Sequence, residues 1–340
     1  MSCLQPVAYH VSVFRHPAHF PTSVWASLED HPQSSNIIYA HAAKFVKVGT
    51  DSAHIQSFNL WIVCWTATST EPTVDFVLSC TTGSLGPYPI FVFTPRSLSL
   101  LTREFVEPRI KSMVSALGAN VAPERVFSVF ALDTVAEAFA AAWTAQTSIQ
   151  LAQNPVYYHS KLMRCTKETF AVEDQKQVSD QSAELRLAVL ADVHEVARLC
   201  RGFAAASEPF VLTEQSALIE ATSLILNGQV WVHTTGAQAS HIACIVAVTR
   251  TTDTVAAITK VYTSPDWRGR GCAGRLVRYV CESLLQEKSS VVLYVAHNNP
   301  AATKVYERVG FVGFTSSSSG TADSWKELGF DRGLVQMGHW

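Results

Sequence analysis

The segment Trp267–Val277, "WRGRGCAGRLV", places three glycines and three arginines within eleven residues, directly before an apolar helical pattern. Glycine disfavours a helix interior by roughly 1 kcal/mol relative to alanine, so a helix that starts here needs a reason for Gly269, Gly271 and Gly274. Glycines let the backbone bring successive N–H groups close to a ligand, and the following helix directs its free N–H groups and positive dipole end into the loop. The alternative is a plain glycine-rich turn. The segment therefore predicts an anion site suited to phosphate.

Two other phosphate-binding loops do not fit this segment. The pattern G-x-x-x-x-G-K-[ST] is absent, which argues against a nucleoside triphosphatase. Gly269, Gly271 and Gly274 have the spacing of a dinucleotide fingerprint, but the loop follows at least four predicted strands. The next strand ends in "YVAHNN", which has no acidic residue for a ribose. A dinucleotide-binding site is therefore not predicted.

The composition of the chain excludes several further classes of protein. The net charge of −2 argues against a nucleic-acid binder. The chain has 340 residues, enough for two domains, and 48% of them are hydrophobic. Eight scattered cysteines without a CxxC pair indicate buried free thiols in a reducing compartment and no metal site. No apolar run is long enough to cross a membrane or to serve as a signal peptide, so a cytoplasmic location is expected.

The order of predicted elements indicates an α/β chain with a mixed sheet. The polar run "VEDQKQVSDQSAE" is the one clear compositional break, and it divides the chain into an amino-terminal domain at 1–171, a linker at 172–183 and a second domain at 184–340. Short runs rich in Val, Ile and aromatic residues are typical of strands, and amphipathic runs of helices. Strands are expected at 59–65, 74–80, 88–94, 126–132, 156–166, 185–190, 230–235, 241–251, 255–263, 290–296 and 311–316. Helices are expected at 101–117, 134–147, 193–203, 214–226 and 301–309, and one after the glycine segment.

Two motifs at the right separation resemble the GNAT superfamily of N-acetyltransferases. "RGRGCA", Arg268 to Ala273, is similar to that family's acyl-coenzyme A signature R/Q-x-x-G-x-G/A. "NNPAATKVYERVGF" matches the second half of its pattern, with Asn299, Ala302, Tyr306 and Gly310-Phe311 in the family's spacing. The resemblance covers about Glu184 to Phe314. It implies a GNAT fold, with the amino-terminal half as a degenerate GNAT-like domain that supports the catalytic half and supplies one wall of the acceptor pocket.

The resemblance also implies which residues would bind acetyl-coenzyme A. In this family the fourth strand splays from the fifth and the pantetheine arm lies in the gap, which here assigns main-chain contacts to strand residues Val261, Tyr262 and Thr263. The pyrophosphate would be held by the loop, namely Arg268, Gly269, Arg270, Gly271, Cys272, Ala273 and Gly274. Asn299 would bond the pantetheine region or cap the helix that follows. A covalent role for Cys272 is not expected, because family members transfer the acyl group directly in a ternary complex.

The catalytic residues implied are Tyr306 and, in second place, His297. Tyr306 matches the tyrosine that protonates the leaving thiolate, with a core aromatic as the alternative. No carboxylate stands where the family places its general base: the fourth strand offers Lys260, and Tyr294 occupies the usual position on the fifth. His233, His241 and His297 are candidates, His297 being the best placed. A water chain or an acceptor that is already neutral would serve instead.

The expected activity is transfer of an acetyl group from acetyl-coenzyme A to the amine of a small molecule, without a metal. A protein or peptide acetyltransferase is the alternative among enzymes, although the near-neutral chain has no acidic run to receive a basic tail. A non-catalytic acyl-coenzyme A sensor is the alternative outside them, motivated by the missing carboxylate.

Overall fold

The computed structural model describes residues 8–48, 59–67, 72–171, 184–235, 241–314 and 323–339. Contacts divide the chain into two compact units, Met1–His159 with Ser316–Trp340, and Ser160–Thr315. The predicted linker at 172–183 lies outside the described residues. The units assign 316–340 to the first half of the chain, whereas the sequence placed this segment in the second domain.

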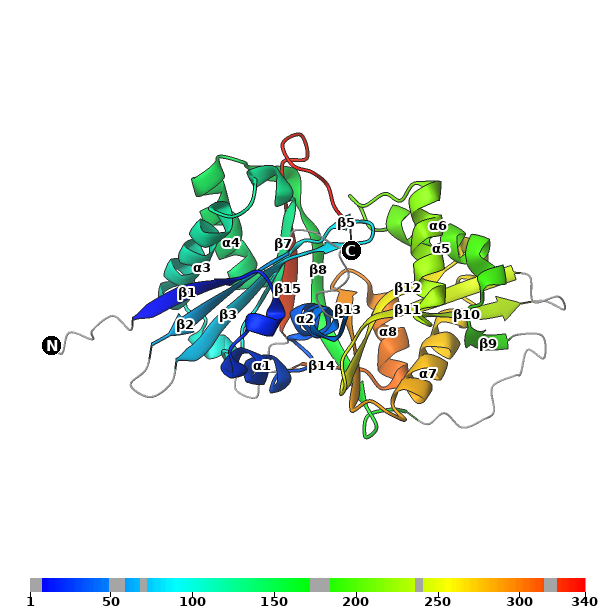
Figure 1. The fold of residues 1–340 in the computed structure, drawn as a ribbon. Coiled ribbons are helices and arrows are strands. Elements are labelled where there is room, and N and C mark those ends of the chain that lie inside the picture. The colour runs from blue at the N-terminus through cyan, green and yellow to red at the C-terminus, as the bar shows by residue number, and fades with distance from the viewer. Residues whose placement is uncertain are drawn as a thin grey trace. The chain divides into compact units, whose positions relative to one another are not determined.

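The first unit is a mixed sheet with helices on both faces (Figure 1). Its strands, in spatial order, are β1 (Tyr9–Phe14), β2 (Leu60–Thr66), β3 (Thr73–Cys80), β6 (Ile90–Phe93), β7 (Ser128–Leu132) and β15 (Ser324–Phe330). A small hairpin comprises β4 (Thr82–Gly83) and β5 (Gly86–Pro87). The helices are α1 (Thr22–Glu29), α2 (Asn36–Val48), α3 (Arg103–Gly118) and α4 (Asp133–Thr147). Strands β2 and β6 are apolar and almost wholly buried, as expected for strands covered on both faces.

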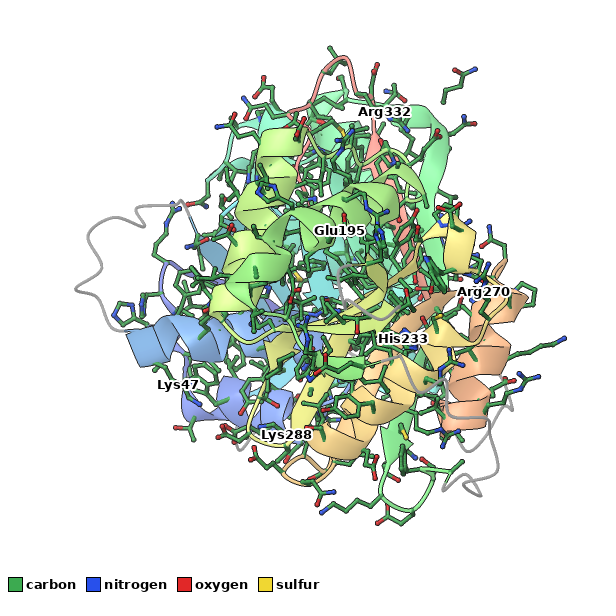
Figure 2. The ribbon with its side chains drawn as sticks, turned by 90° about the vertical axis from the view of Figure 1, so that its right-hand side faces the viewer. Lys47, Glu195, His233, Arg270, Lys288 and Arg332 are labelled. Atoms are coloured by element: carbon green, nitrogen blue, oxygen red, sulfur yellow. The ribbon has the colours of Figure 1, made fainter. Side chains whose placement is uncertain are left out.

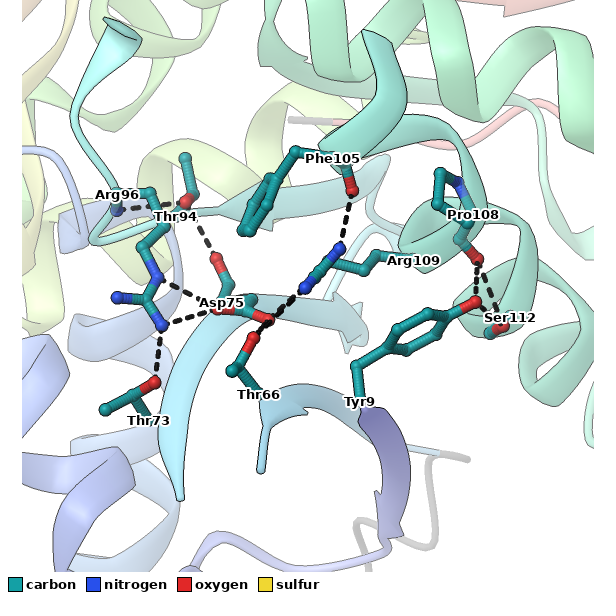
Figure 3. Close-up of polar contacts among 10 residues, drawn as sticks. All are labelled: Tyr9, Thr66, Thr73, Asp75, Thr94, Arg96, Phe105, Pro108, Arg109 and Ser112. Carbon is teal, nitrogen blue, oxygen red and sulfur yellow. Dashed lines mark hydrogen bonds and ion pairs between the residues drawn. The ribbon is translucent and has the colours of Figure 1, made fainter. Parts of the chain in front are cut away.

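A closed network of charges ties the sheet of the first unit to α3 (Figure 3). Asp75 of β3 is fully buried and accepts hydrogen bonds from Arg96, Arg109 and Thr66. The Arg109 guanidinium also donates to the Phe105 carbonyl oxygen and to Thr66, and its Cζ lies 3.9 Å from the Phe105 ring centroid. Because the carboxylate and the Arg109 guanidinium are both buried, removing either one would leave an uncompensated buried charge in this unit.

In the described part of the second unit, a mixed sheet carries two helices on each face. Its strands, in spatial order, are the end of β8 (Leu151–Thr166), then β13 (Ser290–Ala296), β12 (Val255–Thr263), β11 (His241–Thr251), β10 (Val230–Thr235) and β9 (Glu184–Leu187). The short strand β14 (Val312–Gly313) also pairs with β8. Helices α5 (Val193–Ala205) and α6 (Glu214–Leu226) lie on one side of the strands (Figure 1). Helices α7 (Cys272–Leu284) and α8 (Pro300–Val309) lie on the other.

The core of the second unit lies between its sheet and the helices α7 and α8. The buried side chains Leu276, Val277 and Val280 of α7 pack there against Val246 and Val291 of the strands. Their spacing of three and four residues is that of one helical face, which is why the apolar pattern after the glycines predicts a helix.

The two units repeat one core topology. In each unit four strands lie side by side: the first and second pair antiparallel, the second and third parallel, and the third and fourth antiparallel. In the first unit these strands are, in order, β3, β6, β7 and β15. The corresponding strands of the second unit are β11, β12, β13 and β8. A helix connects each parallel pair, α3 in the first unit and α7 in the second. The segment before α3, Pro95–Thr102, contains no glycine, so the first unit repeats the topology without the glycine loop.

The predicted strands and helices agree with these elements apart from their ends, and four regions were missed, one of them the small hairpin of β4 and β5. The sequence predicted no strand at Tyr9–Phe14 or Ser324–Phe330, and no helices before residue 48. The strand predicted at 311–316 is present only as Val312–Gly313 among the described residues. In the part of the chain that the structure describes, no helix is both long and apolar enough to cross a membrane.

Candidate acyl-coenzyme A site

The parallel strands β12 and β13 of the second unit pair along only part of their lengths. Their register runs from Val255, opposite Ser290, to Ile258, opposite Leu293. Beyond this point β12 continues to Thr263 paired with β11 alone, and β13 continues to Ala296 paired with β8. The facing backbone edges of Thr259–Thr263 and Tyr294–Ala296 therefore separate. A separated edge offers N–H and C=O groups to an extended ligand.

A β-bulge at Thr259 marks the start of the separated part of β12. Ile258 pairs with Val248 and Lys260 with Ala247, so Thr259 has no partner in register. The extra residue reverses the alternation of side chains along the strand. Ile258 lies in the core beneath α7, whereas Lys260 lies above the Phe203 ring of α5. After the bulge Val261 packs against the α7 side again.

The last two residues of β12, Tyr262 and Thr263, direct their side chains to opposite faces of the sheet. Thr263 donates a hydrogen bond from its Oγ1 to the Sγ of Cys244 at 3.3 Å, on the α7 side. The Tyr262 ring packs against α5 at Gly202, where an added Cβ would lie 2.5 Å from the ring. Glycine at 202 is thus required for this ring to approach the helix.

The glycine loop follows β12 and leads into α7 as predicted. Gly269 and Gly271 both have φ of +75°, a conformation that favours glycine. Gly271 is the residue before α7, and the first backbone bond into the helix runs from the Arg275 N–H to the Gly271 carbonyl oxygen at 3.1 Å. The N–H groups of Cys272, Ala273 and Gly274 precede that bond, so helix geometry leaves them without an acceptor in the preceding turn. They belong to the segment for which the sequence predicts an anion site, and their role in binding an anion stays a prediction.

Both arginines of the loop are exposed. The Arg268 Nε donates to the Thr263 carbonyl oxygen at 3.3 Å, and its Cζ lies 5.6 Å from the Tyr262 ring centroid. Arg270, near the start of α7 (Figure 2), lies with its Cζ 4.7 Å from the Trp267 ring centroid. Aromatic contacts of this kind position the guanidinium groups without neutralising them. Their charge remains available to phosphate.

Cys272 is buried at the first residue of α7. Burial raises the pKa of its thiol, against the opposing effect of Arg275, which donates to its Sγ at 3.7 Å. A thiol held protonated by burial is a poor nucleophile. This environment agrees with the expectation that Cys272 has no covalent role.

Asn299 caps α8. Its Oδ1 accepts a hydrogen bond from the Ala302 N–H at 3.0 Å, and Pro300 occupies the first helical position. Both features are typical of a helix amino terminus. Of the two roles considered for Asn299, the structure shows the second, in which its side chain caps the helix that follows.

Tyr306 of α8 is 8% exposed and belongs to the core cluster on the α7 side. Its ring packs edge-on against Phe311 with the centroids 5.8 Å apart. Burial raises the pKa of the phenol well above its usual value, and the neighbouring Cys244 and Cys281 raise it further. The hydroxyl therefore stays protonated at neutral pH, and the raised pKa also makes it a weaker acid than a free phenol. Cys244 also accepts the Thr263 hydrogen bond, so Tyr306 lies near the separated end of β12.

The three histidine candidates occupy different places. His297 directly follows β13 and is exposed, and His241 begins β11, also exposed. His233 of β10 is buried, and its Nε2 accepts a hydrogen bond from the Nε of Arg275 at 3.3 Å. A ring nitrogen that accepts from a guanidinium is unprotonated there. The base therefore remains unassigned among the histidines.

The sequence missed one charged side chain near this site, Glu220 of α6. It is buried and ion-paired with Lys260. The signal was present: Glu220 lies on the same helical face as the buried Ala217, Ala221 and Leu224, where a charge is unexpected. Among the described residues, no group of three or more His, Cys, Asp or Glu side chains could hold a metal ion.

Comparisons with known proteins agree with this geometry. The family model "Acetyltransferase (GNAT) family" matches residues 191–311. No curated protein matches the sequence significantly. Several solved structures resemble the chain across both units. A GCN5-related N-acetyltransferase from Sphaerobacter thermophilus is 14% identical, with a TM-score of 0.51 and 94% of each chain covered.

Two further structures extend this likeness. A tandem GNAT protein from the clavulanic acid biosynthesis pathway is 12% identical, with a TM-score of 0.50 and coverage of 94% of this chain and 98% of its own. A Drosophila protein is 9% identical, with a TM-score of 0.62 and the same coverage. At these identities the likeness shows the fold. The family match spans β12, the glycine loop, α7, β13 and α8, and residues 191–311 therefore form a domain of the acetyltransferase (GNAT) family.

Proposed function

We propose that this protein transfers an acetyl group from acetyl-coenzyme A to the amine of a small molecule. The observation that carries the proposal is the separation of β12 from β13 beyond Ile258, directly beside the glycine loop. An extended pantetheine chain fits a free strand edge, and a pyrophosphate fits a helix amino terminus. The two features adjoin because the loop follows β12 without an intervening strand.

The residues of the loop suit a coenzyme A pyrophosphate. A Cβ added at Gly269 would meet nothing within 4 Å, so the loop backbone is open on that side. The N–H groups from Gly269 to Gly274 would hold the phosphates, with Arg268 and Arg270 adding charge. Val261, Tyr262 and Thr263 would bind the pantetheine arm through their main chains. The acyl donor supplies a thioester, whose thiol is the leaving group.

Tyr306 would act as the acid in this reaction. A phenol is protonated at neutral pH and so has a proton for the sulfur as the carbon–sulfur bond breaks, while its raised pKa makes it a weaker acid than a free tyrosine. Attack by the amine is direct, because the buried Cys272 thiol is a poor nucleophile. Direct attack requires both substrates on the enzyme at once, so initial rates at varied concentrations should give the intersecting pattern of a ternary complex.

The test combines binding with turnover. Acetyl-coenzyme A should raise the thermal midpoint of the purified protein by mass action. A panel of aliphatic amines, arylamines, amino acids and lysine peptides is then incubated with acetyl-coenzyme A, and acetylated products are identified by mass spectrometry. Products from small amines support the proposal, and products from peptides alone favour a peptide acetyltransferase. Binding without any product would indicate a non-catalytic acyl-coenzyme A sensor, and no binding would contradict all three.

A further inference from the structure

A buried ion pair lies on the α5 and α6 side of the separated strand segment. The Nζ of Lys260 lies 3.0 Å from the Oε1 of Glu220, and their side chains are 6% and 9% exposed. Lys260 follows the bulge residue Thr259, and Glu220 belongs to α6. The fold thus brings a carboxylate from another element to the strand on which the sequence offers none.

Helix α5 packs against this ion pair. The Nζ of Lys260 lies 4.9 Å from the Phe203 ring centroid. Burial raises the pKa of the Cys200 thiol to about 12, and the nearby Glu220 charge raises it further. Two titratable side chains therefore face the carboxylate, Lys260 from β12 and Cys200 from α5. The ammonium balances the negative charge, and the thiol stays neutral at physiological pH.

The ion pair and Tyr306 lie on opposite faces of the same sheet. Lys260 contacts α5 and α6, whereas Tyr306 lies in the core cluster with α7. Between them run the backbone edges of β12 and β13 where the strands separate. A proton donor for the leaving group and a carboxylate thus flank this edge from either face. This division suits a reaction in which one group loses a proton and another gains one.

We propose that Glu220 accepts, through water, the proton that the acceptor's ammonium group must lose, and that Lys260 is a positioning residue that keeps Glu220 ionised. This inference rests on the proposed acetyl transfer. The ammonium gives one proton to the Glu220 carboxylate, and the resulting neutral amine attacks the thioester carbon. The carbon–nitrogen bond forms and the carbon–sulfur bond breaks, and the thiol leaves with the proton of Tyr306. The second nitrogen proton restores the Tyr306 phenol, and Glu220 releases its proton to solvent.

A purely structural pair would behave differently under substitution. A buried pair that only stabilises the fold affects every acceptor alike, because it acts on the amount of folded protein. A proton acceptor matters only for an acceptor that arrives protonated. Aliphatic amines are ammonium ions at pH 7, whereas arylamines are neutral, so the two classes of acceptor separate the roles.

The first variant is Glu220→Gln in the full-length chain, compared with Glu195→Gln, which removes a half-buried salt-bridging carboxylate of α5 (Figure 2). With an aliphatic amine at pH 7, Glu220→Gln should lower kcat by about 10²-fold, the scale of one general base. The loss should shrink as the pH rises toward the pKa of the amine, and it should be small at every pH with an arylamine. Glu195→Gln should match wild type throughout.

The second pair of variants tests Lys260. Lys260→Arg keeps the positive charge and should retain most of the rate. Lys260→Met leaves the carboxylate uncompensated, so the pKa of Glu220 rises and the acidic limb of the pH–rate profile moves to higher pH. The acetyl-coenzyme A thermal shift of each variant should remain close to wild type, which reports an intact fold and donor site.

The outcomes separate the two proposals. A wild-type protein that acetylates no amine contradicts the proposed function, and this assignment falls with it. A wild-type protein that acetylates aliphatic amines, with a Glu220→Gln variant of the same pH profile, contradicts the role of Glu220 alone. An equal loss of kcat with arylamines and with aliphatic amines would likewise show that the ion pair has a structural role only.

Discussion

The Nε of Arg109 lies 2.8 Å from the Oδ2 of Asp75, and the two side chains are 7% and 0% exposed. The partner carboxylate oxygen, Oδ1, contacts Arg96 at 2.6 Å. One buried carboxylate therefore joins a strand, a helix and the segment that follows β6 (Figure 3). In the second unit the corresponding segment after β12 is the glycine loop. At the corresponding position, the first unit has a network of internal ion pairs instead of a glycine loop.

Asp75→Asn should destabilise the first unit severely. It leaves the buried Arg109 guanidinium without its balancing charge, at a cost of about 3–5 kcal/mol. The control is Glu107→Gln, which breaks the Arg103 pair, whose side chains are 81% and 52% exposed. That change should cost less than about 1 kcal/mol. Urea unfolding followed by fluorescence measures both, and equal losses would show that burial does not set the strength of the network.

Gly271→Ala should weaken acetyl-coenzyme A binding more than it weakens the fold. A left-handed conformation costs a residue with a Cβ about 1–2 kcal/mol, and the added atom would lie 3.1 Å from the Arg275 Nη1. Gly228→Ala is the matched control, because Gly228 also has positive φ, at +63°, and nothing lies within 4 Å of its added Cβ. Both variants should lose similar stability in the absence of ligand. Only Gly271→Ala should reduce the thermal shift with acetyl-coenzyme A, and an undiminished shift would remove the loop from the binding site.

Tyr306→Phe should lower the transfer rate by about 10²–10³-fold while acetyl-coenzyme A binding stays close to wild type. The change removes a hydroxyl and retains the ring that packs on Phe311. Tyr279→Phe, at a residue of α7 that is 38% exposed, is the control and should be silent. The loss at Tyr306 should shrink with thioesters of less basic thiols, because these leave more readily without a proton. A fully active Tyr306→Phe enzyme would mean that the phenol is a core aromatic only.

Alkaline pH should destabilise the protein through its buried thiols. Burial raises the pKa of Cys64, Cys200 and Cys244 to about 12, whereas an unfolded thiol ionises near about 8.5. Above that pH the unfolded chain binds fewer protons than the folded one, so stability falls as the pH rises. Each thiol contributes a slope that grows from about 0.7 kcal/mol per pH unit at about pH 8.5 toward about 1.4 kcal/mol per pH unit above about pH 9.5. Denaturant unfolding under reducing conditions between about pH 8.5 and 9.5 measures it, and Cys200→Ala should flatten the slope by one thiol.

The local part of the site could be predicted from the sequence. Glycine spacing, a preceding strand and an apolar helical pattern are short-range signals, and they placed the loop and α7 correctly because the chemistry of both lies within one continuous segment. The family resemblance added the expectation that α8, with Tyr306, belongs to the same site as the glycine loop. The family match at 191–311 confirms that resemblance, while the roles of the individual residues stay predictions.

The long-range part of the site could not be predicted in this way. Glu220 and Lys260 are forty residues apart in the printed sequence, and their pairing depends on how α6 packs on the sheet. The bulge at Thr259 is also invisible in the pattern, because a period of two continued through "VAAITKVYT" would put Ile258 and Lys260 on one face. Sequence patterning specifies faces of elements, and tertiary packing decides which faces meet.

The contact between β8 and β13 predicts where the second unit can be cut out of the chain. Ser160–Thr166 pairs along the whole of β13, from Ala296 to Ser290, and Thr169 and Phe170 pack on Gly310 so closely that a Cβ there would lie 2.1 Å from the Thr169 carbonyl oxygen. A fragment beginning at Glu184, the predicted domain boundary, lacks this strand and exposes one edge of β13 to water or to other chains.

A fragment of residues 160–315 keeps that strand and follows the contacts of the second unit. It should therefore be monomeric and show cooperative unfolding, and it should gain thermal stability with acetyl-coenzyme A. The 184–340 fragment should aggregate or unfold without a cooperative transition, because it lacks the β8 strand and also carries β15, which pairs with β7 of the first unit. Light scattering and thermal melts of both fragments, purified under identical conditions, make the comparison. Equal cooperativity and equal ligand shifts in the two fragments would show that the strand from β8 is dispensable for the acetyl-coenzyme A site.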